Sequence, residues 1–256
     1  MSRHGIHVLV DAPEVGRNMR DHLTSLICLE VAGGTLKDAT KIGNVINYLT
    51  RRKGMLTSDI AEAYGFVRTD DALELPDVEM IFAPVAYVQE GLNGIPAHGV
   101  SLGPILLQPE SRGSISLASP NPLDKVIVDA GYLSDPNGAD RATMLRALRM
   151  ASDIFATPSM TGVTNGHHLS PLGAERLPAD ELLSVLLEQN SHTLYHPTST
   201  ARMGTDAASV VDPQLRVRGV DRLRIADASV MPEIIRGHTH APTVVIGERA
   251  AQLLRS

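Results

Sequence analysis

The sequence predicts a mixed α/β fold, in which strands, helices, further strands and a closing helix follow one another. Short apolar runs with β-type alternation, such as residues 76–83, are closed by proline or glycine. Residues 138–156 carry apolar side chains at helical spacing, and the segment from about residue 243 onward does the same. No internal repeat or low-complexity linker interrupts this order.

The same patterns place the individual elements. Strands are expected at 6–10, 26–31, 76–83, 102–107, 113–117, 126–130, 215–218 and 223–226. Helices are expected at 41–52, at 138–156, after Pro178, and from about 243 to the C-terminus. The runs 113–117 and 126–130 flank a Pro-Asn-Pro turn, which predicts an antiparallel pair. Gly103-Pro104 lies inside the run 102–107 and favours an edge or irregular strand, because proline cannot donate a hydrogen bond to a sheet.

Composition bounds the class of protein. The chain has 256 residues, 43% of them hydrophobic and 20% charged, which is typical of a soluble globular protein with one or two domains. A net charge of -6, no tryptophan and no basic cluster argue against nucleic-acid binding. The single Cys28 excludes an internal disulfide and a cysteine-based zinc site, and its apolar neighbours predict burial. No run is long enough to span a membrane and no signal peptide is visible, so a cytoplasmic location is expected.

Two histidine-containing loops, 195–204 and 237–243, concentrate the candidate chemistry. A loop histidine can act as a general acid or base, bind a metal, or hold structure through hydrogen bonds. The metal alternative rests on His238 and His240, with His196 or Glu248 to complete a site, but no carboxylate has a familiar ligand spacing. We therefore expect no metal site. No Gly-x-Ser-x-Gly segment is present to support a serine hydrolase.

Five segments occur in one order and carry a family resemblance. They are 15–23 (V-G-R-N-M-R-D-H-L), 196–204 (H-P-T-S-T-A-R-M-G), 211–220 (V-D-P-Q-L-R-V-R-G-V), 223–232 (L-R-I-A-D-A-S-V-M-P) and 241–251 (A-P-T-V-V-I-G-E-R-A-A). Together they resemble the C-terminal half of the glucose-methanol-choline (GMC) oxidoreductases, and the alcohol and choline dehydrogenase branch is nearest.

The resemblance implies FAD-dependent oxidation of a small alcohol to an aldehyde or ketone, with oxygen, a quinone or another electron acceptor. It implies that His196 is the base toward the substrate hydroxyl and that His238 is the second active-site residue. Asp227 and Ala228 match positions against the ribityl and phosphate portion of the flavin. His238 and Thr239 match positions beside the isoalloxazine ring.

The resemblance also implies a domain organisation. Residues 1–25 and 195–256 correspond to segments of an FAD-binding domain, and 26–194 to a substrate-binding domain with a mixed or antiparallel sheet. The Gly-x-Gly-x-x-Gly turn that cradles the FAD pyrophosphate is absent, so a fragment, a split gene product or a wrongly placed start is expected. The half that carries this turn is then an expected partner.

The sequence departs from the family pattern at three positions: Ser199 replaces a usual glycine, Ala201 a common cysteine and His240 a frequent asparagine. Ser199 puts the loop conformation in doubt if that position needs a positive φ. Two alternatives to an enzyme half stay open: a non-catalytic remnant or binding module of the same fold, and a histidine-based metal protein.

Overall fold

A computed structural model describes residues 1–91 and 95–255, and its contacts divide the chain into two units. Unit 1 comprises 1–22, 107–140 and 195–256; unit 2 comprises 23–106 and 141–194. The expected domains 1–25, 26–194 and 195–256 differ from these units chiefly at 107–140, which joins unit 1 through its contacts. The functions assigned to those domains remain predictions.

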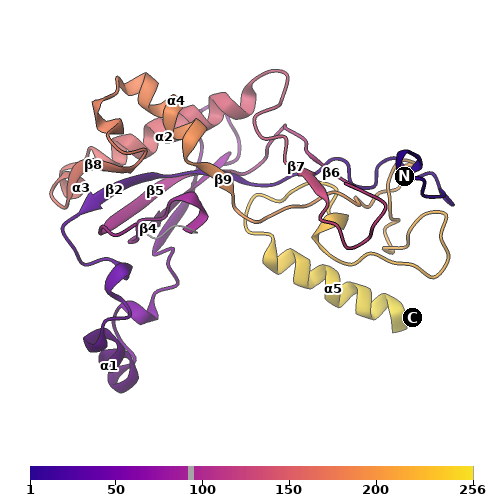
Figure 1. Cartoon of the computed structure of the whole chain (residues 1–256), viewed down its shortest axis with the longest axis horizontal. Coiled ribbons are helices and arrows are strands. Elements are labelled where there is room, and N and C mark those ends of the chain that lie inside the picture. Colours follow the sequence, from indigo (N-terminus) through magenta and orange to yellow (C-terminus); the bar gives the residue numbers. More distant parts are fainter. Residues whose placement is uncertain (92–94, 256) are drawn as a thin grey trace. The chain divides into compact units, whose positions relative to one another are not determined.

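Unit 2 is built on a seven-stranded antiparallel sheet (Figure 1). Its strands are β1 (Leu23–Ser25), β2 (Ile27–Val31), β3 (Ala63–Val67), β4 (Val78–Ala83), β5 (Gly99–Leu106), β8 (Thr164–Ser170) and β9 (Ser191–Thr193). The order runs β3-β4-β5, and the far edge of β5 pairs with both β1 and β2. Strand β9 then pairs with β1, and β8 with β2. The predicted mixed α/β class with an antiparallel sheet is confirmed.

Strand β5 corrects the expectation of an edge or irregular strand at 102–107, because it lies in the middle of the sheet. Its partner changes along its length, from β2 opposite Leu102 to β1 opposite Ile105. Gly103 and Pro104 lie at this change of partner. Proline has no N–H to donate, and on the edge that faces β1 and β2 the ladder is already interrupted at this point. A Cβ on Gly103 would lie 2.1 Å from the Ser25 carbonyl oxygen, so the close approach of β1 requires glycine there.

Helices cover one side of this sheet in unit 2. Figure 1 shows α2 (Ala139–Phe155) and α4 (Ala179–Gln189) over it, while α1 (Ile42–Arg51) projects away and α3 (Pro158–Thr161) follows α2. Helix α2 buries four side chains completely at helical spacing: Met144, Ala147, Leu148 and Ala151. The Ser25 hydroxyl donates to the Leu186 carbonyl at 3.1 Å and so ties β1 to α4. Cys28 is fully buried and unpaired, as its apolar neighbours predict.

Within residues 1–91 and 95–255, six short 3-10 helices accompany the strands and α-helices. They are η1 (Ser2–His4), η2 (Leu36–Asp38), η3 (Met55–Thr57), η4 (Gln89–Gly91), η5 (Ala174–Arg176) and η6 (Ala228–Val230).

Unit 1 contains little regular structure. Strands β6 (Ser114–Ser116) and β7 (Ile127–Asp129) form the antiparallel pair that the sequence predicts. Helix α5 (His240–Arg255) follows the second histidine loop and confirms the expected closing helix, while Ser256 lies outside the described residues. A small apolar core forms between α5 and the preceding loops, and its buried members are Ala201, Val210, Val211, Leu215, Val230 and Ala250.

Three expected strands of unit 1 are wrong. Residues 6–10 form no strand, and Leu9 remains 88% exposed, so the apolar run meets no partner sheet. The runs 215–218 and 223–226 form only isolated bridges, between Arg216 and Arg224 and between Val217 and Val211. The pairing is too short to make a regular ladder.

The N-terminal segment is held in unit 1 by main-chain contacts at Gly16. Its N–H donates to the Thr200 carbonyl at 2.8 Å, and its own carbonyl accepts from the Ile115 N–H at 2.6 Å. Gly16 has φ +81°, and a Cβ there would lie 2.3 Å from the Ile115 oxygen. Only glycine meets both conditions, and the segment that follows Gly16 is thereby aligned with the 196–204 loop.

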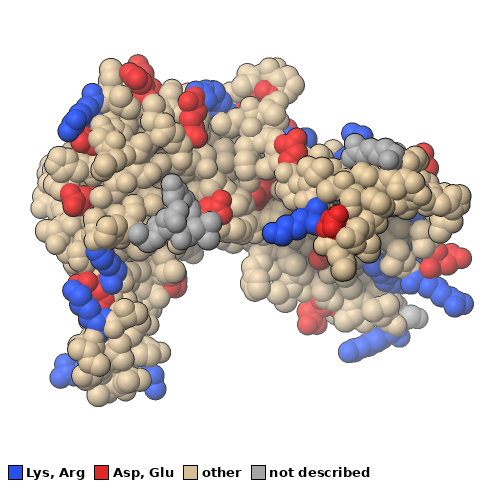
Figure 2. All heavy atoms as spheres, in the orientation of Figure 1, with Lys and Arg blue, Asp and Glu red and all other residues tan. Residues whose placement is uncertain are grey.

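Among the described residues, no helix combines the length and the apolar character needed to cross a bilayer. On the face that Figure 2 displays, basic and acidic side chains are interspersed, without a continuous basic surface.

Candidate active site

His196 lies in the loop that follows β9, and main-chain contacts with the N-terminal segment fix that loop. Arg20 and Thr198 form an antiparallel bridge, with N–H to carbonyl distances of 3.2 and 2.8 Å. The His196 N–H donates to a carboxylate oxygen of the buried Asp21 at 2.8 Å. The other Asp21 oxygen accepts from the Tyr132 hydroxyl. Asp21 therefore anchors the backbone of His196 and is itself held from a third segment of unit 1.

His22, the next residue after Asp21, contacts the ring of His196 directly. The two Nδ1 atoms are 2.8 Å apart, and the rings meet edge-on with centroids 5.1 Å apart. The other nitrogen of His22, Nε2, lies 3.0 Å from the Leu107 carbonyl oxygen and 3.1 Å from the Ile235 carbonyl oxygen. His22 is 1% exposed, so both its nitrogens are committed to protein atoms.

His238 reaches the same place from the second histidine loop, two residues before α5 begins. Its ring meets that of His196 edge-on, with an interplanar angle of 86° and centroids 5.2 Å apart. The structure therefore brings together the two histidines that the sequence singles out, although 42 positions separate them in the chain (238 − 196). His238 is exposed, whereas His196 is half-buried.

The environment keeps the rings of His22 and His196 neutral near pH 7. The pKa of His196 is lowered to about 4, chiefly by burial and also by the neighbouring His22 and His238, against the opposing effect of Asp21. The pKa of His22 is also lowered by burial, against the opposing effect of its two carbonyl partners. A neutral imidazole offers one lone pair, so the cluster can accept a proton at neutral pH.

The positions expected to hold a cofactor lie in the segments that flank α5 and η6. Asp227 caps η6 by accepting from the Ser229 N–H at 2.8 Å, and its side chain is otherwise open to solvent. Thr239 is buried, and its carbonyl accepts from Thr243 at the start of α5.

The loop after His196 shows how the unusual Ser199 is accommodated. Ser199 has φ +72°, which is the left-handed conformation that favours glycine, and it is 1% exposed. Its hydroxyl donates to the Thr198 Oγ1 at 3.2 Å. The position therefore does require a positive φ, and the chain adopts it with a serine.

Sequence reasoning missed His22, Asp21 and Tyr132. The signal that could have found the first two is the D-H pair within residues 15–23, a segment used only for recognising the family. Tyr132 has no comparable sequence signal, since it reaches Asp21 across 111 positions.

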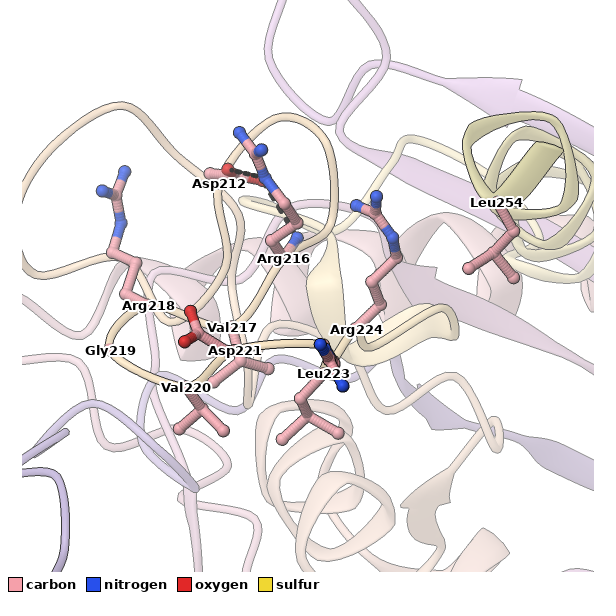
Figure 3. Close-up of a pocket in the computed structure, with 11 residues that line it drawn as sticks. Asp212, Arg216, Val217, Arg218, Gly219, Val220, Asp221, Leu223, Arg224 and Leu254 are labelled. Atoms are coloured by element: carbon pink, nitrogen blue, oxygen red, sulfur yellow. Dashed lines mark hydrogen bonds and ion pairs between the residues drawn. The ribbon is translucent and has the colours of Figure 1, made fainter. Parts of the chain in front are cut away.

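Two further observations bear on alternative sites. Across residues 1–91 and 95–255, no group of three or more His, Cys, Asp or Glu side chains is arranged to hold a metal ion. A hollow of about 670 Å³ lies beside the hairpin of residues 212–224, with Leu254 of α5 on its wall (Figure 3). Arginine side chains surround it, and the view shows Arg216 paired with Asp212.

Comparison with known proteins identifies the family to which this fold and histidine cluster belong. The model of the GMC oxidoreductase family matches residues 109–247. The chain belongs to the GMC oxidoreductase family, which consists of FAD-dependent oxidoreductases, and the predicted resemblance is confirmed.

Individual relatives show how much of a family member is present. The chain is 50% identical over 256 residues to an uncharacterized GMC-type oxidoreductase of Mycobacterium tuberculosis, covering all of this chain and 48% of that protein. It is 37% identical to the choline oxidase of Arthrobacter globiformis, covering 44% of it. A formate oxidase of Aspergillus oryzae, studied for its FAD modification, superposes with a TM-score of 0.84 at 25% identity over 99% of this chain and 49% of that one. The chain spans about half the length of the relatives it matches.

Proposed function

We propose that this chain supplies the alcohol-activating half of an FAD-dependent GMC oxidoreductase, which oxidises a small alcohol to an aldehyde or ketone. The observation that carries the proposal is the contact between His196 and His238, brought by separate loops to ring centroids 5.2 Å apart. Family membership supports the reaction class, and the choline oxidase relative supports an alcohol as the substrate.

In this proposal His196 is the general base. Oxidation of an alcohol breaks the O–H bond and transfers the carbinol hydrogen with its electron pair, and FAD, when bound, supplies the acceptor for that hydride. His196 is neutral above pH 4 and so holds a lone pair ready for the hydroxyl proton. Asp21 holds its main chain, and this keeps the imidazole at one place in the site.

His238 is proposed to hold the substrate oxygen. Its ring meets the ring of His196 at nearly a right angle, so one substrate oxygen can be in reach of both imidazoles. A hydrogen bond from His238 would stabilise the negative charge that develops on the oxygen as its proton leaves.

The chain's own residues fit the flavin chemistry at two places. Asp227 uses one carboxylate oxygen to cap η6 and exposes the rest of its side chain, which suits a hydrogen bond from a ribityl hydroxyl. Thr239 ends the second histidine loop where α5 begins, and the first N–H groups of a 16-residue helix favour an electron-rich or anionic partner. We propose that Asp227, Ala228, His238 and Thr239 hold the FAD.

We further propose that an N-terminal half like that of the longer relatives, carrying the pyrophosphate-binding turn, completes the site. Supporting this, the segment 223–227 pairs on one side only: Leu223 and Ile225 bond to the 215–217 segment. The main-chain groups of Arg224 and Ala226 point to the other side and have no hydrogen-bond partner within the described residues. This open edge, beside the hollow of Figure 3 with the exposed Leu223 and Leu254, is suited to accept a strand.

The test is reconstitution with the missing half. We would co-express the chain with the N-terminal half of the Mycobacterium tuberculosis relative, which is 50% identical over the shared region. The expected product is a yellow complex whose flavin absorbance is bleached by alcohols without oxygen. The His196→Ala variant should keep the colour but reduce its flavin on the order of 100-fold or more slowly, since general bases contribute about that much.

One control variant and three contrary outcomes define what this test can show. His4→Ala changes another unit 1 histidine that lies outside the cluster, and it should leave flavin reduction unchanged. Equal reduction rates in His196→Ala and the unaltered complex would remove His196 from the role of base. A folded, colourless complex would instead favour a non-catalytic binding module, and stoichiometric metal in it would favour the histidine-based metal protein.

A further inference from the structure

We infer that His22 is a positioning residue that fixes the tautomer of His196, with the proton on Nδ1 and the lone pair on Nε2. The inference concerns the ring of His196 itself. Its catalytic consequence rests on the function proposed above.

The first step concerns the protons of His22. Its Nε2 lies 3.0 and 3.1 Å from two carbonyl oxygens, those of Leu107 and Ile235. Carbonyl oxygens only accept hydrogen bonds, so Nε2 must carry a hydrogen. A neutral imidazole carries one N–H, so the Nδ1 of His22 is then an acceptor.

The alternative is a doubly protonated His22, which the surroundings oppose. The ring is 1% exposed, and burial lowers its pKa. The His196 ring contacts the Nδ1 of His22, the His238 ring contacts that of His196, and Asp21 is the acidic neighbour. The ring nitrogens of His22 contact another imidazole and two carbonyl oxygens, so a charged His22 would be buried without a direct carboxylate contact.

The second step passes this constraint to His196. The two Nδ1 atoms are 2.8 Å apart, a distance at which one nitrogen must donate and the other accept. The Nδ1 of His22 accepts, so the Nδ1 of His196 donates. A neutral His196 then has its lone pair on Nε2, the ring nitrogen that faces away from His22.

This tautomer gives His22 a function in catalysis without contact to the substrate. In the proposed reaction the hydroxyl O–H bond breaks and a new N–H bond forms at Nε2 of His196, while the Nδ1–H bond to His22 is kept throughout. The opposite tautomer would put a hydrogen on Nε2 and leave no base in the site. Adjacent residues thus divide the work: Asp21 holds the main chain of His196, and His22 holds its ring.

The test is nitrogen NMR of the full chain labelled with ¹⁵N-histidine at pH 7. Long-range ¹H–¹⁵N correlations distinguish a protonated Nδ1 from a protonated Nε2 in each ring. We expect His196 to show a protonated Nδ1 and His22 a protonated Nε2. A His196 ring with its proton on Nε2 in the unaltered chain overturns the inference, and no variant is needed for that result.

Matched variants then identify the cause. His22→Asn keeps an acceptor oxygen near the place of Nδ1 and should preserve the Nδ1–H form of His196. His22→Leu removes the acceptor and should shift His196 toward the Nε2–H form that predominates in free histidine. His4→Asn, a histidine with a carbonyl partner in the same unit, should change nothing at His196. An unchanged His196 tautomer in a folded His22→Leu variant would show that His22 does not set it.

The reconstituted enzyme separates this inference from the proposed function. His22→Leu should lower kcat at least tenfold with little change in KM, and His22→Asn should restore most of it. If the complex is inactive but the NMR tautomers are as expected, the proposed function fails and the positioning role of His22 stands. If His22→Leu leaves kcat unchanged in an active complex, its catalytic consequence is wrong.

Discussion

Different kinds of interaction stabilise the interior of each of the two units. Unit 2 depends on a continuous antiparallel ladder of hydrogen bonds. Its β4–β5 pair contributes six consecutive residue pairs. Unit 1 has one short strand pair, and isolated bridges, loop conformations and buried side-chain hydrogen bonds do the remaining work. The candidate chemistry is found in the irregular unit. Loops can present several side chains to one point, whereas strands alternate theirs between two faces.

The ladder of unit 2 is most sensitive at the change of partner on β5. Gly103→Ala would place a Cβ 2.1 Å from the Ser25 carbonyl oxygen, which lies in backbone and cannot move aside. We expect a loss of roughly 3 kcal/mol or more in the free energy of unfolding, at the upper end for overpacking. Urea unfolding followed by circular dichroism measures it. Gly65→Ala in β3 is the matched control, because nothing lies within 4 Å of its added Cβ. Equal losses at the two glycines would contradict the proposed role of the partner change.

Acid should act on unit 1 through its buried imidazoles. The folded pKa of His196 is about 4, below the unfolded value of 6.5, so the unfolded chain takes up the proton first as pH falls. The stability is fully present well above pH 6.5 and is lost progressively down to pH 4. The loss is on the order of 2 kcal/mol for this half-buried ring, because solvent screens part of the effect. Urea midpoints at several pH values between 7 and 4 provide the measurement. His196→Gln cannot titrate, so its stability should fall less over this range, and an equally steep fall would refute the assignment.

The smallest effect tests whether loop conformation limits the stability of unit 1. Ser199 holds φ +72° at a buried position, which costs a residue with a Cβ about 1 kcal/mol. Ser199→Gly and Ser199→Ala both lose the hydroxyl contact to Thr198, so their difference isolates the backbone. We expect the glycine variant to be the more stable of the two by about 1 kcal/mol, measured by thermal unfolding. The reverse order would show that this loop is not strained.

The same contrast explains which features the sequence could predict. Helices α2, α4 and α5 and the pair β6–β7 follow from local periodicity and turn residues, and the structure has them. The central position of β5 could not be predicted, because it depends on pairing with two short strands far away in the chain. These are β1, with three residues, and β2, with five. The segments 215–218 and 223–226 have the alternating pattern of strands. They pair with neighbouring segments only through isolated bridges, which are too short to form a sheet.

For the site, motifs located His196 and His238, and the structure brings them together. The D-H pair could have singled out His22, but the sequence could not predict its role. Its contact with His196 joins residues 174 positions apart, and the role depends on which nitrogen faces a carbonyl. Tautomers follow from geometry, and no periodicity encodes them.

The discontinuity of unit 1 has a consequence for biosynthesis. Proteins leave the ribosome from the N-terminus onward, and His22 emerges long before the residues that surround it in the folded state. Its ring cannot meet both carbonyl partners until Leu107 and then Ile235 have been made. Strands β2 to β5 of unit 2 can pair earlier, because all of them lie before residue 107. The histidine cluster is therefore among the last parts of the nascent chain to form, and a ribosome stalled before residue 196 carries His22 without its partner ring.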